Sequence, residues 1–291
     1  MAEPKGWDAS SDVDSGAATS SPAALSASSY SDYLRLPALL TLQKPLARPL
    51  VPDEMLFIIV HQAHELWFKE MLSELHVLGS DVDARRFTSG VRTLARLTAI
   101  VHLLGEHMGV LATMPAHEFQ RFRSVLGTSS GLESEQFRRM ERLVGLGALA
   151  LAPHALALAP RADVEGGIEA APSRSGSIRE AFWRAVASDR PSVGALVSAA
   201  ELDPLALGRA FVTAFEEPAL APQRGLGEAM LVFDEEMVAW RRRHFEVALG
   251  MLGKSAGTGG SSGATYLRAT MERRFFPELW HWRDARGADA G

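Results

Sequence analysis

The stretch "FIIVHQAHELWFKEML", residues 57–72, decides the expected fold because its apolar residues recur at helical spacing. A proline–aspartate pair at 52–53 is a helix start signal, and no helix-breaking residue follows before Gly79. The pattern therefore predicts one long helix from this pair to at least that glycine. Two histidines, His61 and His64, lie inside this otherwise mostly apolar helix and require an explanation.

Helical spacing continues along most of the chain, whereas strictly alternating segments typical of strands are scarce. We expect an all-α helical bundle in which the first two long helices pack as an antiparallel pair. Residues 149–176 mix Pro and Gly with no sustained period. The remaining expected helices cover 84–111, part of 112–131, 133–148, 177–188, 191–201, 204–217 and 222–252, followed by a Gly/Ser/Thr loop and an aromatic-rich last helix.

The composition excludes several classes of function. The chain has 291 residues, of which 47% are hydrophobic and 22% charged, and its formal net charge of −5 gives no basic surface for nucleic acid. It contains no cysteine, so disulfides, thiolate metal sites, a cysteine nucleophile and covalent haem attachment through C-x-x-C-H are all excluded. Any metal must be held by His, Asp, Glu or a cofactor.

The N-terminal region differs in composition from the rest. Residues 1–29 are rich in Ser and Ala and lack the apolar core of a secretory signal, so we expect a disordered tail. Residues 30–46 form an amphipathic arm broken by two prolines, and 30–291 are expected to form a single domain. No apolar run is long enough to cross a membrane. We expect a soluble, cytoplasmic protein that binds no membrane.

The histidine pair on the first helix has two interpretations. Histidines three apart can converge on zinc, but the order H-Q-A-H-E at 61–65 is not the H-E-x-x-H of zinc peptidases, and no third ligand is evident nearby. The alternative is a packed histidine whose ring is satisfied by a backbone carbonyl. Phe57 shares the helical face of His61.

Two later stretches also carry candidate groups. His244 shares a stripe with Trp240 and the apolar side of its helix, while Arg241, Arg242 and Arg243 are expected to point outward. A neutral histidine on an apolar helix is the form that haem iron takes as axial ligand, although a packed histidine fits the pattern equally well.

Arg123 follows aromatic residues and precedes a Gly/Ser loop, so it could clamp a carboxylate or simply be a solvated surface residue. The run at 257–263 resembles a phosphate loop only in composition and is better described as a loop with backbone and hydroxyl donors.

Six sequence motifs, taken together and in their order along the chain, resemble those of the tryptophan 2,3-dioxygenase family of haem enzymes. They extend from about residue 30 to residue 283, which is far more specific than any one motif. The motifs are "YSDYLRL…LLTLQKPL", "FIIVHQAHELWFKEML", "ATMPAHEFQRFRSVLGTSSG…QFRRME", "WRRRHFEV", "GTGGSSGATYL" and "FFPELW".

The resemblance implies a helical subunit that encloses a pocket for non-covalent haem b, active with Fe²⁺ and usually assembled as a homotetramer. It implies a proximal iron ligand and a nearby tryptophan, a distal histidine near the substrate indole, an arginine for the substrate carboxylate, and a loop threonine for its amino-acid end. It also implies N-terminal aromatics lent to a neighbouring subunit. The matching residues are His244 and Trp240 for the cofactor, with His244 as the metal ligand, and Phe57, His61, Phe119, Arg123, Thr258, Tyr30 and Tyr33 for the substrate, with His61 also catalytic.

The activity implied by the resemblance is insertion of O₂ across the C2–C3 bond of the indole of L-tryptophan, giving N-formyl-L-kynurenine as in the kynurenine pathway of tryptophan catabolism. The alternative is a haem monooxygenase acting on tryptophan or a substituted analogue. Phe119 stands where many relatives carry Tyr, Pro115 follows "ATM" where Thr is common, and 149–222 do not align with the family pattern. These departures bear on the substrate and the outcome of the reaction, not on haem binding.

Overall fold

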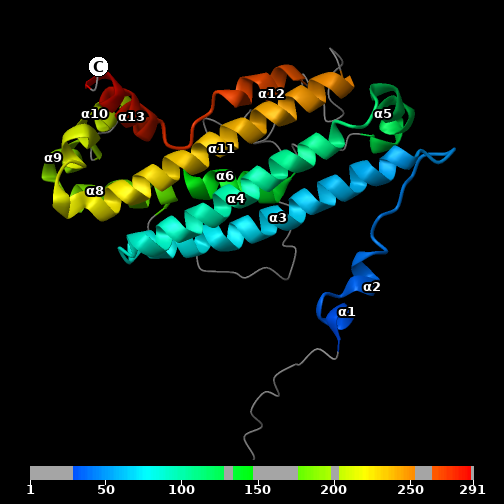
Figure 1. The fold of residues 1–291 in the computed structure, drawn as a ribbon, viewed down its shortest axis with the longest axis horizontal. Coiled ribbons are helices and arrows are strands. Elements are labelled where there is room, and N and C mark those ends of the chain that lie inside the picture. The colour runs from blue at the N-terminus through cyan, green and yellow to red at the C-terminus, as the bar shows by residue number, and fades with distance from the viewer. Residues whose placement is uncertain (1–28, 128–133, 147–175, 198–202, 253–263, 290–291) are drawn as a thin grey trace, which may run out of the picture. The chain divides into compact units, whose positions relative to one another are not determined.

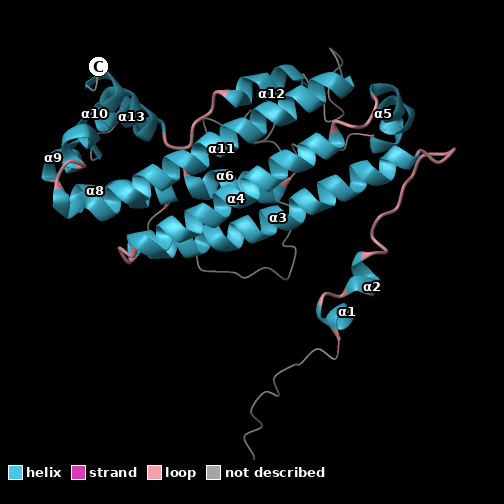
Figure 2. Cartoon of the chain, in the orientation of Figure 1, coloured by secondary structure: helices cyan, strands magenta, loops and turns pink. Residues whose placement is uncertain are grey.

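A computed structural model describes residues 29–127, 134–146, 176–197, 203–252 and 264–289. Within these ranges every regular element is a helix and no strand is present, which confirms the all-α prediction (Figure 2). The chain divides into a first unit, 1–42, and a second unit, 43–291. The expectation of one domain over 30–291 stays a prediction, and the expected disordered tail lies almost wholly outside the described residues.

The first unit contributes two short helices, α1 (Tyr30–Tyr33) and α2 (Leu36–Leu39). Ser29 caps α1 by accepting the backbone N–H of Asp32. Arg35, at φ 54°, lies in the left-handed region between the two helices, where the chain turns. The expected amphipathic arm is therefore two single helical turns rather than a continuous helix.

The second unit is built on three long helices that lie side by side (Figure 1). They are α3 (Pro52–Asp83), α4 (Phe87–Leu111) and α11 (Ala221–Leu252). A three-residue turn joins α3 to α4, so the two run antiparallel as expected, and α4 also packs along α11. The first helix runs past Gly79 to Asp83, with that glycine buried in the interior. The glycine is tolerated inside the helix, as in many helices, at a modest cost.

The shorter helices pack around this trio. α12 lies along α11, α5 contacts α3 and α11, and α10 packs closely on α13 at the other end (Figure 1). Their bounds are α5 (Ala116–Phe122), the 3₁₀ turn η1 (Arg123–Leu126), α6 (Glu135–Val144), α8 (Ile178–Asp189), α9 (Pro191–Val197), α10 (Pro204–Ala214), η4 (Pro218–Leu220), α12 (Ala264–Met271) and α13 (Pro277–Asp289).

Local sequence signals explain where the main helices begin. Pro52 occupies the first turn of α3, where its missing N–H leaves no intrahelical bond unmade. Glu54, almost fully buried, accepts the backbone N–H groups of Leu46 and Ala47 at 2.7 and 2.9 Å and so ties the incoming chain to the helix start. Ser177 begins α8 with a capping box.

Among the described residues, no single helix is both long and apolar enough to cross a membrane. Two consecutive segments, Phe87–Leu111 and Ala116–Leu126, reach the length and hydropathy of a membrane span only when they are taken together, and the chain bends sharply between them. The first of these helices is α4, which packs between α3 and α11.

The contact between α10 and α13 depends on a glycine. A Cβ placed on Gly208 would lie 2.6 Å from the Cβ of His281 and 2.8 Å from the carbonyl oxygen of Glu278, so the two backbones approach too closely for any side chain. Gly208→Ala should lower the free energy of unfolding by about 1–3 kcal/mol, the usual cost of overpacking. Urea denaturation measures the change.

Gly225→Ala in α11 is the matched control, because nothing lies within 4 Å of the added methyl. It should stabilise the protein by roughly 0.5–1 kcal/mol through helix propensity. An equal effect of the two alanines would contradict the close approach of α10 and α13.

Candidate functional site

Two histidines on α3 share one hydrogen-bonding arrangement. The Nδ1 of His61 lies 2.7 Å from the carbonyl oxygen of Phe57, and the Nδ1 of His64 lies 2.8 Å from that of Val60. A carbonyl can only accept, so each Nδ1 carries the proton, and in the neutral ring Nε2 is left as an acceptor. Burial lowers the pKa of His61, which the Phe57 carbonyl and Glu65 only partly oppose. His61 therefore presents a neutral acceptor near neutral pH.

His64 lies deeper, with 5% of its surface exposed. Burial, opposed by the Val60 carbonyl, lowers its pKa to about 4, with smaller contributions from neighbouring histidines. Its ring centroid lies 5.6 Å from that of His107 on α4 and 6.5 Å from that of Trp240 on α11. His64 thus occupies the junction of the three long helices, behind His61.

His244 on α11 is also uncharged near neutral pH. Burial, with smaller contributions from the nearby His61 and His64, lowers its pKa to about 4. The ring is half-buried, lies 5.4 Å from that of Trp240, and forms no hydrogen bond with any described residue. A neutral imidazole is an available nitrogen ligand.

The three arginines before His244 do not behave alike. Arg242 is exposed, as expected, whereas Arg243 is half-buried and reaches toward α4, and Arg241 is 4% exposed. The prediction that all three point outward was therefore wrong for Arg241, which turns inward to Glu141 of α6 and the carbonyl oxygen of Arg273.

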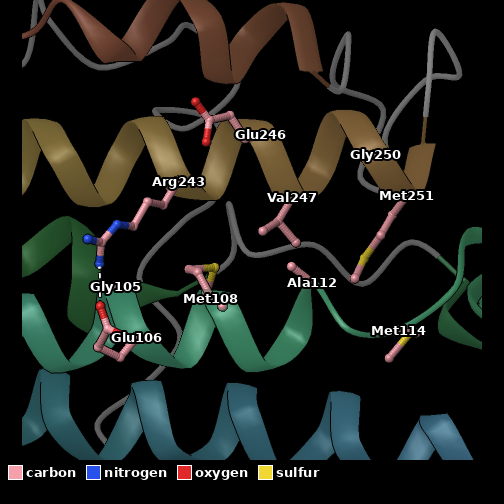
Figure 3. A pocket seen from close by; sticks show the side chains of 11 residues that line it. Gly105, Glu106, Met108, Ala112, Met114, Arg243, Glu246, Val247, Gly250 and Met251 are labelled. Carbon is pink, nitrogen blue, oxygen red and sulfur yellow. Dashed lines mark hydrogen bonds and ion pairs between the residues drawn. The ribbon is translucent and has the colours of Figure 1, made fainter.

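A cavity of about 480 Å³ lies between α4 and α11, beside the helix that carries His244 (Figure 3). Val247 and Met251, one and two turns beyond His244, point from α11 toward Met108 and Ala112 of α4. The rest of the lining is formed by Gly105, Glu106, Gly109, Met114, Arg243, Glu246 and Gly250.

The polar edge of this cavity is an ion pair. Arg243 reaches across from α11 to Glu106 of α4, 2.9 Å away, and its guanidinium lies against Gly105, where a Cβ would meet Nη1 at 2.5 Å (Figure 3). Charged groups therefore gather at one edge while the methionines and Val247 form an apolar interior.

Aromatic side chains connect α5 with α3. The ring of Phe57 lies 4.0 Å from His61, 5.9 Å from Phe119 and 5.5 Å from Phe122, measured between centroids. Arg123 directly follows Phe122, is half-buried, and begins η1 at the C-terminal end of α5. The structure therefore brings Phe57, His61 and Phe119 into one cluster, with the backbone of Arg123 next to it.

Three predicted substrate-binding residues, Thr258, Tyr30 and Tyr33, stay predictions. Thr258 lies outside the described residues. Tyr30 and Tyr33 belong to the first unit and are 76% and 75% exposed. Their exposure leaves both rings available to another chain.

Sequence reasoning missed Phe122 and His107. Phe122 is fully buried against Phe57, and its signal was the aromatic pair at 119 and 122 on a short helix. His107 follows Leu104 by three residues and precedes Leu111 by four, so helical spacing alone placed it near the buried face of α4.

The nitrogen donors of the cluster around His64 and Trp240 suit a haem group, whereas His244 is not among the residues that line the cavity between α4 and α11. Two polar atoms of the cluster, the Nδ1 of His107 and the Nε1 of Trp240, are buried and have no hydrogen-bond partner among the described residues. Buried polar groups without partners are uncommon and often indicate a missing ligand or water. Among the described residues no three His, Asp or Glu side chains form a metal-binding group. A single neutral imidazole suits a metal that brings its own four ligands.

Comparison with known proteins gives a consistent result. The family model described as tryptophan 2,3-dioxygenase matches residues 14–150 and 208–285. The unmatched part between these ranges overlaps the stretch that the sequence motifs left unaligned.

Curated relatives cover most of this chain and of their own length. A tryptophan 2,3-dioxygenase of Polaromonas sp. (strain JS666) is 36% identical over 257 residues, 88% of this chain and 87% of the relative. Those of Rhodococcus jostii (strain RHA1) and Pseudomonas aeruginosa are 36% and 34% identical, covering 86% and 88% of this chain and 89% of each relative. Matches of this identity and length show that the chain belongs to the tryptophan 2,3-dioxygenase family.

Proposed function

We propose that this protein is a haem-dependent dioxygenase that converts L-tryptophan to N-formyl-L-kynurenine with O₂. The observation that carries the proposal is the placement of two uncharged histidines, His61 on α3 and His244 on α11, close enough that His61 lowers the pKa of His244. Membership of the family supports the substrate and the reaction. No feature of the described residues favours the monooxygenase alternative.

The cofactor is haem b, held without a covalent link because the chain has no cysteine. His244 would hold the iron, with the ring of Trp240 packed 5.4 Å away, one turn before it on α11. When bound, the haem supplies the ferrous iron at which dioxygen is activated.

The residues of α3 and α5 would bind the substrate. The Nε2 of His61 is an acceptor, so it can accept the N–H of the indole, whose only polar atom is a donor. Phe57 and Phe119 would contact the indole ring and exclude water. Arg123 would pair with the carboxylate and Thr258 would contact the amino-acid end, so the reacting carbon pair is held in one orientation.

Assembly follows from the same resemblance. The exposed Tyr30 and Tyr33 would complete the substrate pocket of a neighbouring copy, in a homotetramer. We place the protein in the cytoplasm, with tryptophan and O₂ as its partners and neither nucleic acid nor membrane.

Removing the ligand nitrogen tests the cofactor. His244→Ala should abolish stoichiometric haem retention after reconstitution and gel filtration, because no other described imidazole combines low proton affinity with freedom from hydrogen bonds. His102→Ala is the control, since that side chain is 60% exposed and pairs with Glu236. A His244→Ala protein that keeps full haem content and an unchanged five-coordinate spectrum would refute the assignment.

Arg123 is tested with two substrates that differ in one group. Tryptamine lacks the carboxylate of tryptophan, so wild-type protein should consume oxygen much faster with tryptophan. Arg123→Ala should lower kcat/KM for tryptophan roughly ten- to a hundredfold, corresponding to about 1.5–3 kcal/mol for a charge-assisted contact, and leave tryptamine turnover nearly unchanged.

Haem content should stay normal in that variant. Arg121→Ala is the control, because Arg121 is exposed and pairs with Glu118 on its own helix. If the preference for tryptophan survives in Arg123→Ala, Arg123 does not bind the carboxylate.

A further inference from the structure

The helix that carries His244 also carries two buried charges. Asp234 and Arg241 are 0% and 4% exposed, and their spacing of seven residues places them on one face of α11. Buried charges are retained only when partners satisfy them, and such networks are weak sources of stability. Their partners therefore indicate what the two residues do.

Asp234 holds the chain that leads into α13. Its Oδ2 accepts the backbone N–H groups of Phe275 and Phe276 at 2.9 and 3.2 Å and the indole N–H of Trp280 at 2.9 Å. Because three donors of this segment bind one carboxylate oxygen of Asp234, the segment is held at one level along α11 and on one side of that helix.

Arg241 joins α11 to two other parts of the second unit. Its Nη1 donates to the carbonyl oxygen of Arg273 at 2.8 Å, its Nη2 lies 3.5 Å from the buried Oε1 of Glu141 on α6, and its Cζ lies 4.8 Å over the ring of Phe275. The guanidinium has a rigid planar fork, so these contacts are satisfied at one orientation of α11.

The contacts that α11 makes with α4 differ from the buried polar contacts of Asp234 and Arg241. Toward α4 the helix presents apolar side chains such as Val247 and Met251, whose packing is non-directional. The two polar pairs between these helices, Arg243 with Glu106 and His102 with Glu236, are partly exposed and constrain α11 only weakly. Apolar packing allows small rotations of a helix about its axis, whereas hydrogen bonds weaken steeply with angle. The polar contacts of Asp234 and Arg241 therefore determine the rotation of α11.

His244 follows Arg241 by three residues, less than one helical turn. Any rotation of α11 that breaks the Arg241 contacts turns the imidazole of His244 by the same angle. We propose that Arg241 and Glu141 are positioning residues that set the direction of the His244 ring toward the iron. This inference rests on the proposed role of His244 as haem ligand.

A second buried ion pair provides a matched comparison. Arg179 of α8 and Glu278 of α13 lie 2.7 Å apart, with Glu278 fully buried and also accepting the indole N–H of Trp183. This pair joins helices that do not carry His244. Loss of either pair should destabilise the fold, but only loss of the Arg241 pair should change the haem.

The experiment compares haem-loaded variants by two measurements, the rate of haem transfer to excess apomyoglobin and the absorption spectrum of the ferrous protein. Arg241→Met should raise the rate of haem loss by about ten- to a hundredfold, as for other residues that orient metal ligands, and shift the ferrous spectrum. Arg241→Lys keeps the charge and should restore part of the wild-type behaviour.

The double variant Arg241→Met/Glu141→Met removes both members of the ion pair, while Asp234 keeps its three N–H donors, so this variant keeps the proposal testable if the single variant does not fold. It should show the same fast haem loss. Arg179→Met should lower the midpoint of urea denaturation while its rate of haem loss and its spectrum stay those of wild type.

Two results would overturn the proposal. One is a folded double variant with wild-type haem loss and spectrum. The other is equal acceleration of haem loss in Arg179→Met, which would reduce the effect to general stability. Retention of haem by His244→Ala, measured in the same series, would instead contradict the proposed ligand and is thereby distinguished from failure of the positioning role.

Discussion

The three long helices of this protein enclose histidines that carry no charge near neutral pH. Burial disfavours protonation of His61, His64 and His244, and the rings on α3 add to the effect on α11. An imidazole can ligate iron or accept an indole N–H only while its nitrogen is unprotonated. The desolvated setting between α3, α4 and α11 is therefore the constraint on which cofactor binding and substrate recognition both depend.

The helices around these histidines have different roles. Toward α4, α11 borders a cavity with apolar side chains and a partly exposed ion pair at its edge, whereas Asp234 and Arg241 bind α6 and the chain before α13. α5 brings Phe119 and Phe122 against Phe57, so an aromatic surface lies beside His61. The substrate side and the ligand side thus come from helices far apart in sequence that meet at His64 and Trp240.

The sequence was a good guide to the helices and to the residues that face the centre. Periodicity identifies α3, α4 and α11 because each buries a continuous apolar stripe, and i, i+4 spacing places Phe57 beside His61. It failed for Arg241, because three successive arginines normally lie on the solvent side and their partners in α6 and near Phe275 are distant in sequence. The cavity was likewise hidden, since Met108 and Met251 become neighbours only after α4 and α11 pack.

The described structure and the family together lead to a reaction in which both atoms of one O₂ enter one tryptophan. The most direct test is a single turnover of the haem-reconstituted ferrous protein with L-tryptophan and ¹⁸O₂, followed by the mass of the product. Our account predicts an N-formylkynurenine that carries two ¹⁸O atoms. A product with one ¹⁸O atom and an intact indole ring, or no product from protein with full haem content, would contradict it.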